Sequence, residues 1–191
     1  MLKKIFVVMV IVLSCINLFA NTRDVNNAGE FQDALLDGKV DKIVLRTNLS
    51  GNFECKRGDI TIDGNGYSIT PNNKNNEILF FNGPMYNRHE YVTIQNLTFE
   101  GAEDCGLYVE NFNKIKLDHI GFSDCEKGLT LDGCFNTEIT SCEFNQCFCA
   151  IYLANGTTHY GGYIKIFDSL FRNFDVAIYD YCIPSSEKGQ A

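Results

Sequence analysis

The sequence predicts an all-β fold, a right-handed parallel β-helix of about five or six coils that begins with a short capping helix. Three observations lead to this prediction. An eight-residue apolar pattern repeats along the chain, a second apolar pattern follows each copy, and Asn, Asp and Gly separate the copies. Short apolar runs of period two between such turn residues are typical of strands and not of helices.

The two repeated patterns define the coils. The first has Ile or Leu at its third position and Phe at its eighth, and its copies are Val92–Phe99, Ile115–Phe122, Thr137–Phe144 and Ile164–Phe171. The second opens with Gly or Ala and recurs at spacings of 22, 22 and 27 residues, as Gly106–Val109, Gly128–Leu131, Ala150–Leu153 and Ala177–Asp180. Because one coil cannot bury its own apolar face, successive coils must stack, about 4.8 Å apart.

The chain divides into four parts. These are a signal peptide at 1–20, an N-terminal cap at 21–41, the β-helix at 42–181 and a polar tail at 182–191. Within the β-helix, Lys42–Leu49 and Ile60–Thr70 also alternate and predict earlier coils with looser spacing. The longest gap between copies contains an insertion, Asn155–Tyr163.

The two ends of the solenoid differ. In the cap, Phe31, Ala34 and Leu35 fall at helical spacing after Asn27, a residue suited to cap a helix N-terminus, so a short helix should cover the first coil. No comparable apolar segment follows Asp180. We expect the last coil either to be covered by a partner, for example through self-association, or to belong to a truncated member of a longer family.

The first twenty residues predict export. Lys3 and Lys4 precede the apolar run Ile5–Leu13, and Ala20 offers a small residue for cleavage. Alternatively, the segment that ends at Cys15 resembles a bacterial lipobox, in which this cysteine would carry a lipid anchor. The run is too short to predict a transmembrane span. Both readings place the protein outside the cell or in the cell envelope, where disulfides are allowed.

The charge of the chain limits its partners. The whole chain has a formal net charge of −8, from 16 basic and 24 acidic residues. Without the two lysines of the signal peptide the mature chain would carry −10. Nucleic acid and anionic membranes are therefore not expected as partners, because both require a positive patch.

Eight cysteines follow the signal peptide. Cys125 and Cys147 occupy the same slot, three residues after the Phe of two successive copies of the first pattern. The rise between coils falls within the Cα separation of a disulfide, so these two could be bonded. The alternative is that they pack as small apolar side chains. No metal-ligand spacing of Cys and His predicts zinc.

The repeats resemble those of the right-handed parallel β-helix proteins, which include pectate lyases, polygalacturonases, periplasmic carbohydrate-binding proteins and bacterial surface adhesins. The resemblance covers roughly residues 42–181 and implies a fold, since this scaffold serves both catalytic and structural roles. Ile115–Cys125 is similar to the V-W-I-D-H motif of pectate lyases, with Asp118 and His119 in the corresponding places. The calcium-binding carboxylates and arginine segment of that family are not complete here. We favour an outward strand position for Asp118 and a turn position for His119.

Two carboxylates are candidates for a cation site. Asp104 and Glu126 lie 22 residues apart, so stacked coils could place them one above the other. Calcium prefers such oxygen ligands, and it is the only cofactor that the sequence raises. The alternative is that both are solvated turn residues.

A column of aromatic residues is the candidate ligand surface. The third position of the second pattern should point outward, and it holds Tyr108, Thr130, Tyr152 and Tyr179, which we call the tyrosine column. Flat rings suit the apolar faces of sugars, and their hydroxyls can form hydrogen bonds. Tyr160, in the insertion, would overhang the same region. The alternative is that the stacked rings only stabilise neighbouring strands.

These features favour a secreted or cell-envelope β-helix that is not catalytic and that binds a polysaccharide or a surface protein, as an adhesin does. A polysaccharide lyase or glycoside hydrolase acting on acidic polysaccharide is one alternative. A purely structural surface domain is the other. The sequence leaves the question of enzymatic activity open.

Overall fold

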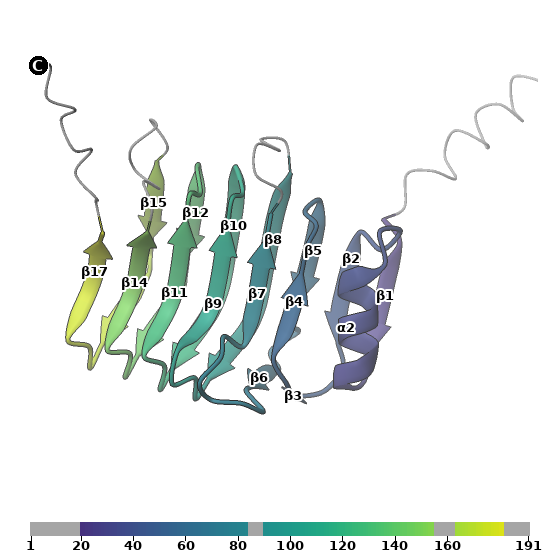
Figure 1. Cartoon of the computed structure of the whole chain (residues 1–191), viewed down its shortest axis with the longest axis horizontal. Helices are drawn as coiled ribbons and strands as arrows, with labels where there is room; N and C mark the ends of the chain where they lie inside the picture. The colour runs from purple at the N-terminus through teal and green to yellow at the C-terminus, as the bar shows by residue number, and fades with distance from the viewer. Residues whose placement is uncertain (1–19, 84–89, 155–162, 182–191) are drawn as a thin grey trace, which may run out of the picture.

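The computed structural model describes residues 20–83, 90–154 and 163–181. Over these residues the protein is a nearly all-β solenoid of about six turns with a single short helix at its N-terminal end (Figure 1). All paired strands run parallel. The predicted parallel β-helix with a capping helix is therefore confirmed.

Two sheets line the solenoid. The eleven-stranded sheet, sheet A, follows the path β1 (Thr22–Val25), β2 (Lys42–Leu45), β5 (Ile60–Asp63), β8 (Tyr91–Glu100), β10 (Lys114–Ser123), β12 (Thr137–Thr140) and β15 (Ile164–Phe167). Four short strands extend it: β3 (Leu49–Ser50), β6 (Ser68–Thr70), β13 (Glu143–Asn145) and β16 (Leu170–Arg172). The six-stranded sheet, sheet B, contains β4 (Phe53–Cys55), β7 (Leu79–Asn82), β9 (Cys105–Glu110), β11 (Lys127–Asp132), β14 (Cys149–Ala154) and β17 (Val176–Asp180).

The strand register places equal positions of the repeats above one another. The third positions pair Ile94 with Leu117 and Leu117 with Ile139. The eighth positions form one stack of parallel phenylalanine rings along the core. Their centroids are 5.5 Å apart from Phe99 to Phe122, 4.8 Å from Phe122 to Phe144 and 4.9 Å from Phe144 to Phe171.

Gly opens two copies of the second pattern where the backbone of the next coil and the phenylalanine stack both come close. A Cβ at Gly106 would lie 2.9 Å from the carbonyl oxygen of Gly128 and 3.1 Å from the ring of Phe122. A Cβ at Gly128 would likewise lie 2.8 Å from the carbonyl oxygen of Ala150. The two repeated patterns therefore meet in the core, one supplying the large ring and the other the small residue.

The corners of the coils explain the polar residues between the patterns. The fifth position of the first pattern has a left-handed backbone in all four copies, at Asn96, His119, Ser141 and Asp168, with φ between 48° and 54°. Asn and Asp adopt this conformation more readily than apolar residues. His119 therefore lies at a left-handed bend inside strand β10, whereas the sequence predicted a turn residue there.

Helix α2 (Ala28–Leu36) closes the N-terminal end of the solenoid. The Asn27 side chain accepts a hydrogen bond from the Glu30 backbone N–H at 2.9 Å, as predicted for an N-cap. The Glu30 carboxylate in turn accepts from the Asn26 N–H at 2.7 Å, which completes a reciprocal cap. The apolar face of the helix is fully buried at Phe31 and Leu35.

Two features of this cap were not expected from the sequence. Strand β1 precedes the helix and pairs with β2, so the cap also extends sheet A. Arg57 reaches back from the next coil and donates hydrogen bonds to three backbone carbonyls, those of Ala34, Leu35 and Val40, at 3.3, 3.0 and 2.7 Å. The arginine thus satisfies carbonyls at the helix C-terminus that have no partner within the helix.

The last described coil is open. The apolar residues of this coil that stack on the core of the coil before it are partly or largely exposed. Ile178, for example, is 49% exposed, whereas its partner Ile151 on the preceding coil is fully buried. Within residues 163–181 no side chain is buried. The polar tail at 182–191 lies outside the described residues, and self-association through this end stays a prediction.

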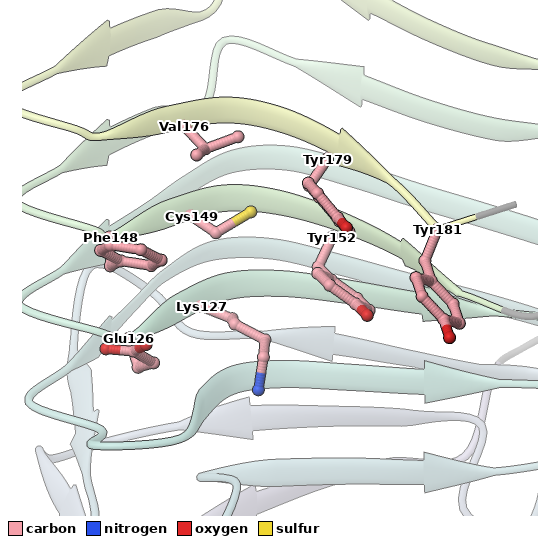
Figure 2. A pocket seen from close by; sticks show the side chains of 8 residues that line it. All are labelled: Glu126, Lys127, Phe148, Cys149, Tyr152, Val176, Tyr179 and Tyr181. Atoms are coloured by element: carbon pink, nitrogen blue, oxygen red, sulfur yellow. The ribbon is translucent and has the colours of Figure 1, made fainter.

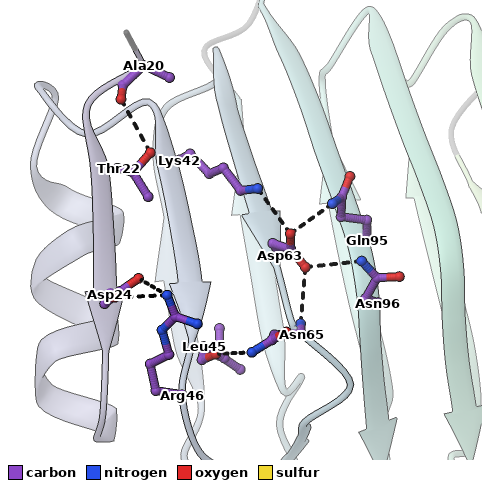
Figure 3. A network of polar contacts seen from close by, with 10 residues as sticks. All are labelled: Ala20, Thr22, Asp24, Lys42, Leu45, Arg46, Asp63, Asn65, Gln95 and Asn96. Atoms are coloured by element: carbon purple, nitrogen blue, oxygen red, sulfur yellow. Dashed lines mark hydrogen bonds and ion pairs between the residues drawn. The ribbon is translucent and has the colours of Figure 1, made fainter.

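A polar network joins the first coils on the outer side of sheet A (Figure 3). The Asp63 carboxylate accepts hydrogen bonds from Lys42 Nζ at 3.0 Å, Gln95 Nε2 at 2.9 Å, Asn96 Nδ2 at 3.1 Å and the Asn65 backbone N–H at 3.1 Å. Burial alone raises the pKa of Asp63, but these four donors outweigh it and hold that pKa below its ordinary value. The ionised carboxylate thus ties three successive coils together.

Replacing Phe122 with Ala should lower the free energy of unfolding by about 3–5 kcal/mol, because it removes one ring from the middle of a buried stack. Urea denaturation followed by circular dichroism would measure the change. Phe167→Ala is the matched control, since this ring is 51% exposed on β15. A loss at Phe122 no larger than the loss at Phe167 would contradict a core role for the stack.

Asp63→Asn should destabilise the protein at neutral pH, and its difference from wild type should shrink in acid. The pKa of Asp63 is lower in the folded chain than in the unfolded chain. Its stabilisation is therefore complete above the unfolded value, about 3.9, and is lost as the pH falls through the folded value. Urea denaturation at a series of pH values would test this.

The control for this experiment is Asp24→Asn. Asp24 pairs with Arg46 at 2.9 Å, but its side chain is 52% exposed, so its replacement should change the free energy of unfolding little. A difference between Asp63→Asn and wild type that stays constant as the pH is lowered would show that the network does not depend on the charge of Asp63.

Candidate functional site

The tyrosine column lies on the outer side of sheet B. The register pairs Tyr108 with Thr130, Thr130 with Tyr152, and Tyr152 with Tyr179, as the second pattern predicts. The column continues toward the N-terminal end, where Phe80 pairs with Tyr108. Phe80 was not anticipated, because Leu79–Asn82 does not open with a small residue and so does not match the pattern.

The N-terminal half of the column is packed into the protein surface. The rings of Phe80 and Tyr108 meet edge to face, with centroids 5.1 Å apart. The Tyr108 hydroxyl donates to Asp132 Oδ2 at 2.8 Å, and burial, followed by this carboxylate, raises the pKa of Tyr108. Thr130 is only 2% exposed. The expectation of one continuous exposed column is therefore wrong at Thr130, and Tyr108 stabilises neighbouring strands.

The C-terminal half of the column is more open. The rings of Tyr152 and Tyr179 stack with centroids 5.3 Å apart and an interplanar angle of 16°. On the preceding coil, Lys127 Nζ lies 5.9 Å from the Tyr152 centroid. Since Tyr152 has a neighbour on each adjacent coil, its ring faces are not free. Tyr179 is 44% exposed, and it has no described coil beyond it.

A groove of about 380 Å³ opens beside these two tyrosines (Figure 2). It is lined by Glu126, Lys127, Phe148, Cys149, Tyr152, Val176, Tyr179 and Tyr181. Figure 2 shows Phe148 and Glu126 on one side, the three tyrosines on the other, and Cys149 and Val176 between them. Phe148 is 52% exposed and Tyr181 is 46% exposed, so both rings are available to a ligand.

Sequence reasoning identified Tyr152 and Tyr179 but missed Phe148, Lys127 and Tyr181. The repeats held a signal for two of them. Phe148 stands directly before β14, in the slot that Glu126 occupies before β11. Tyr181 lies two residues after Tyr179, and strand alternation therefore places it on the same face. A sequence pattern can distinguish these aromatic residues from core residues only when both the position in the coil and the type of side chain are considered.

The carboxylates predicted for calcium have different surroundings. The coil register brings Asp104 and Glu126 to corresponding positions directly before β9 and β11. Asp104 forms an ion pair with Lys127 Nζ at 2.8 Å. Burial lowers the pKa of Lys127, but Asp104 outweighs it and raises that pKa overall. Glu126 is exposed on the side of the groove.

A metal ion at this position would compete with Lys127 for Asp104. Across residues 20–83, 90–154 and 163–181, no group of three or more His, Cys, Asp or Glu side chains is arranged to hold a metal ion. Calcium at Asp104 and Glu126 stays a prediction.

The pair that resembles a pectate lyase motif lies elsewhere. Asp118 belongs to β10 in sheet A, and its carboxylate lies 2.8 Å from Nδ1 of the neighbouring His119. The His119 side chain is 65% exposed at a coil corner. These two residues do not line the groove on sheet B.

The comparison with known families fits this architecture. A family model for a pectate lyase-like adhesive domain matches residues 22–128, which is more than half of the chain. The chain belongs to this family. The matched part of the adhesive domain runs from β1 into β11, whereas Phe148 and the last two coils that form the groove follow it. No curated protein and no solved structure matches the chain.

Several predicted features lie outside the residues that the structure describes. They are the signal peptide, the anchor position Cys15 and the insertion residue Tyr160. Within the described residues, no helix has the length and apolar character needed to cross a membrane. Export and a lipid anchor therefore stay predictions.

The described cysteines are buried. All seven described cysteines are free thiols. Cys125 and Cys147 occupy the same slot on adjacent coils, as predicted, and a hydrogen bond from Cys147 lowers the pKa of Cys125. The two sulfur atoms are thus close neighbours in the reduced form, and a disulfide between them stays a prediction.

Oxidised glutathione, added while the chain refolds from urea, should convert this pair to a disulfide and release two molecules of reduced glutathione. Refolding is needed because the two thiols are 3% and 1% exposed in the folded chain, where glutathione cannot reach them. Proteolysis without reduction, followed by mass spectrometry, should recover linked peptides that contain Cys125 and Cys147. Cys147→Ser should abolish the link and Cys142→Ser should not. Recovery of a different pair, or of none, would contradict the prediction.

Proposed function

We propose that this adhesive domain acts on the outside of the cell or in the cell envelope, where it binds a glycan through the groove on sheet B. The observation that carries the proposal is the pair of exposed rings, Phe148 and Tyr181, that stand on opposite sides of an open groove. Isolated exposed apolar residues are common, but exposed rings gathered around one hollow indicate a binding site.

The chemistry of the groove suits a sugar. Aromatic faces pack against the C–H face of a pyranose ring, while hydroxyl groups and charged side chains at the edge form hydrogen bonds. Tyr152 and Tyr179 point their hydroxyls toward Tyr181, while Cys149 and Val176 line the groove between these tyrosines and Phe148. The family supports adhesion as the wider role, and the predicted signal peptide supports an exported location.

A glycoside hydrolase is the second candidate, and one observation favours it. Glu110 and Asp132 are direct partners on the adjacent strands β9 and β11. Burial, followed by the charge of Asp132, raises the pKa of Glu110, as expected for a carboxyl that could donate a proton. Against this role, the Tyr108 hydroxyl already occupies one oxygen of Asp132.

Phe148→Ser and Tyr181→Ser should each weaken glycan binding about tenfold, because each removes one ring from the groove. Affinity electrophoresis of the full chain in gels that contain galactomannan, chitin oligosaccharide conjugates or polygalacturonate would measure retardation. Tyr91→Ser is the matched control, since Tyr91 is 41% exposed on β8 in sheet A.

Three outcomes separate the candidates. Retardation that depends on Phe148 and Tyr181, without release of reducing ends, supports a binding module. Release of reducing ends by the wild-type chain, and its loss in Glu110→Gln, would establish the hydrolase. Equal retardation of wild type and both groove variants, or retardation in no gel, would refute binding through this groove and leave a structural role.

A further inference from the structure

The outer side of sheet B carries more negative than positive charge. Apart from Asp180, which shares the inward register position of Leu153, seven acidic residues lie on the strands of this sheet, directly before them or along a hollow beside helix α2: Glu54, Glu77, Asp104, Glu110, Glu126, Asp132 and Asp175. The two lysines on the same surface are each paired with one of these acids. Lys56 lies 3.3 Å from Glu54, and Lys127 lies 2.8 Å from Asp104. The described part of this face therefore has an uncompensated negative charge.

Acids recur at one position of successive coils, and one of them, Glu126, lines the groove. The residues directly before β9, β11, β14 and β17 are Asp104, Glu126, Phe148 and Asp175. We call these four positions the acidic rim, because three of them hold a carboxylate. Phe148 thus has an acidic residue in the same position of the coil before it and of the coil after it, and the backbones of neighbouring coils are about 4.8 Å apart. Both Glu126 and Asp175 are exposed. An exposed ring between two carboxylates is an environment that attracts a cation.

The protein itself shows how an ammonium group fits this surface. The Nζ atom of Lys127 forms an ion pair with the Asp104 carboxylate at 2.8 Å and lies 5.9 Å from the centre of the Tyr152 ring. A carboxylate and an aromatic ring thus hold one ammonium group together. The same pair of groups recurs farther along the rim, where Phe148 stands beside Glu126 and Asp175. The cation that lines the groove among the described residues is Lys127, and Asp104 pairs with it, so Glu126 and Asp175 are not its partners in this ion pair.

We infer that the groove selects a glycan that carries free amino groups over one that carries carboxylates. The inference rests on the proposed glycan-binding function and names its ligand class. The pyranose body would lie against Phe148 and Tyr181, and an ammonium group would meet Glu126 or Asp175. A uronic acid polymer would instead bring its charge close to these carboxylates, and like charges at this distance repel.

Three oligosaccharides of equal length test the charge preference. They are the hexasaccharide of glucosamine, its fully N-acetylated counterpart, which has the same backbone without the charge, and the hexasaccharide of galacturonic acid. Isothermal titration calorimetry of the full chain would be run in low salt, at a pH at which the amines are protonated. We expect the glucosamine form to bind about tenfold more tightly than the acetylated form, and the galacturonic acid form to bind most weakly. Added salt should reduce the preference.

Two variants locate the effect. Glu126→Gln and Asp175→Asn keep the shape of the rim and remove one charge each, so each should weaken binding of the glucosamine form about threefold more than it weakens binding of the acetylated form. Glu138→Gln, on the outer side of β12 in sheet A, is the matched control and should change neither. Equal losses for both oligosaccharides in the rim variants would contradict an electrostatic role.

The outcomes distinguish this inference from the proposed function. If the acetylated and glucosamine forms bind equally, and binding depends on Phe148, the glycan-binding function stands and the charge preference is wrong. If no oligosaccharide binds, the proposed function fails as well. If hexalysine binds as tightly as the glucosamine form, the groove recognises charge without sugar, and the inference is overturned.

Discussion

The in-register pairing of successive coils is the constraint on which the rest of this structure depends. Backbone hydrogen bonds join each coil to the next in a fixed register. The position of a residue in one coil therefore fixes the position of its counterpart in every other coil. A slip of one residue would move Phe122 from the core to the solvent side. The continuous phenylalanine stack and the small residues that face it at Gly106 and Gly128 penalise such a slip.

This constraint explains how much of the fold could be predicted. From Val92 onward the patterns are regular, and the predicted alignment agrees with the strand register. The upstream coils were harder, because Ile60 pairs with Val92 across 32 residues, in place of about 22, and Leu79–Asn82 lacks the small opening residue. Strand β1 was missed because its residues Thr22 to Asp24 are polar, and pairing with β2 involves only their backbone.

The candidate site was less predictable than the fold, for a physical reason. A slot determines whether a side chain points inward or outward, but its exposure depends on neighbours in other columns. Thr130 points outward and is still buried, and Tyr108 is held by a hydrogen bond to Asp132, two slots away on the next coil. Phe148 is available because the same slot on the neighbouring coils holds exposed carboxylates, and these do not cover its ring.

The position of the groove links the candidate site to the open end of the solenoid. Val176, Tyr179 and Tyr181 come from the last described coil or follow it directly, and the backbone edge of β17 has no described strand beyond it. Anything that stacks on this edge, whether more chain or a second copy, would cover the outer face of Tyr179 and add one more position to the acidic rim. Since Phe148 lies one coil earlier, it would stay at the side of the groove in either case. A covered end would thus lengthen the groove along the axis, and the contacts proposed for Phe148 and Glu126 do not require the end to remain open.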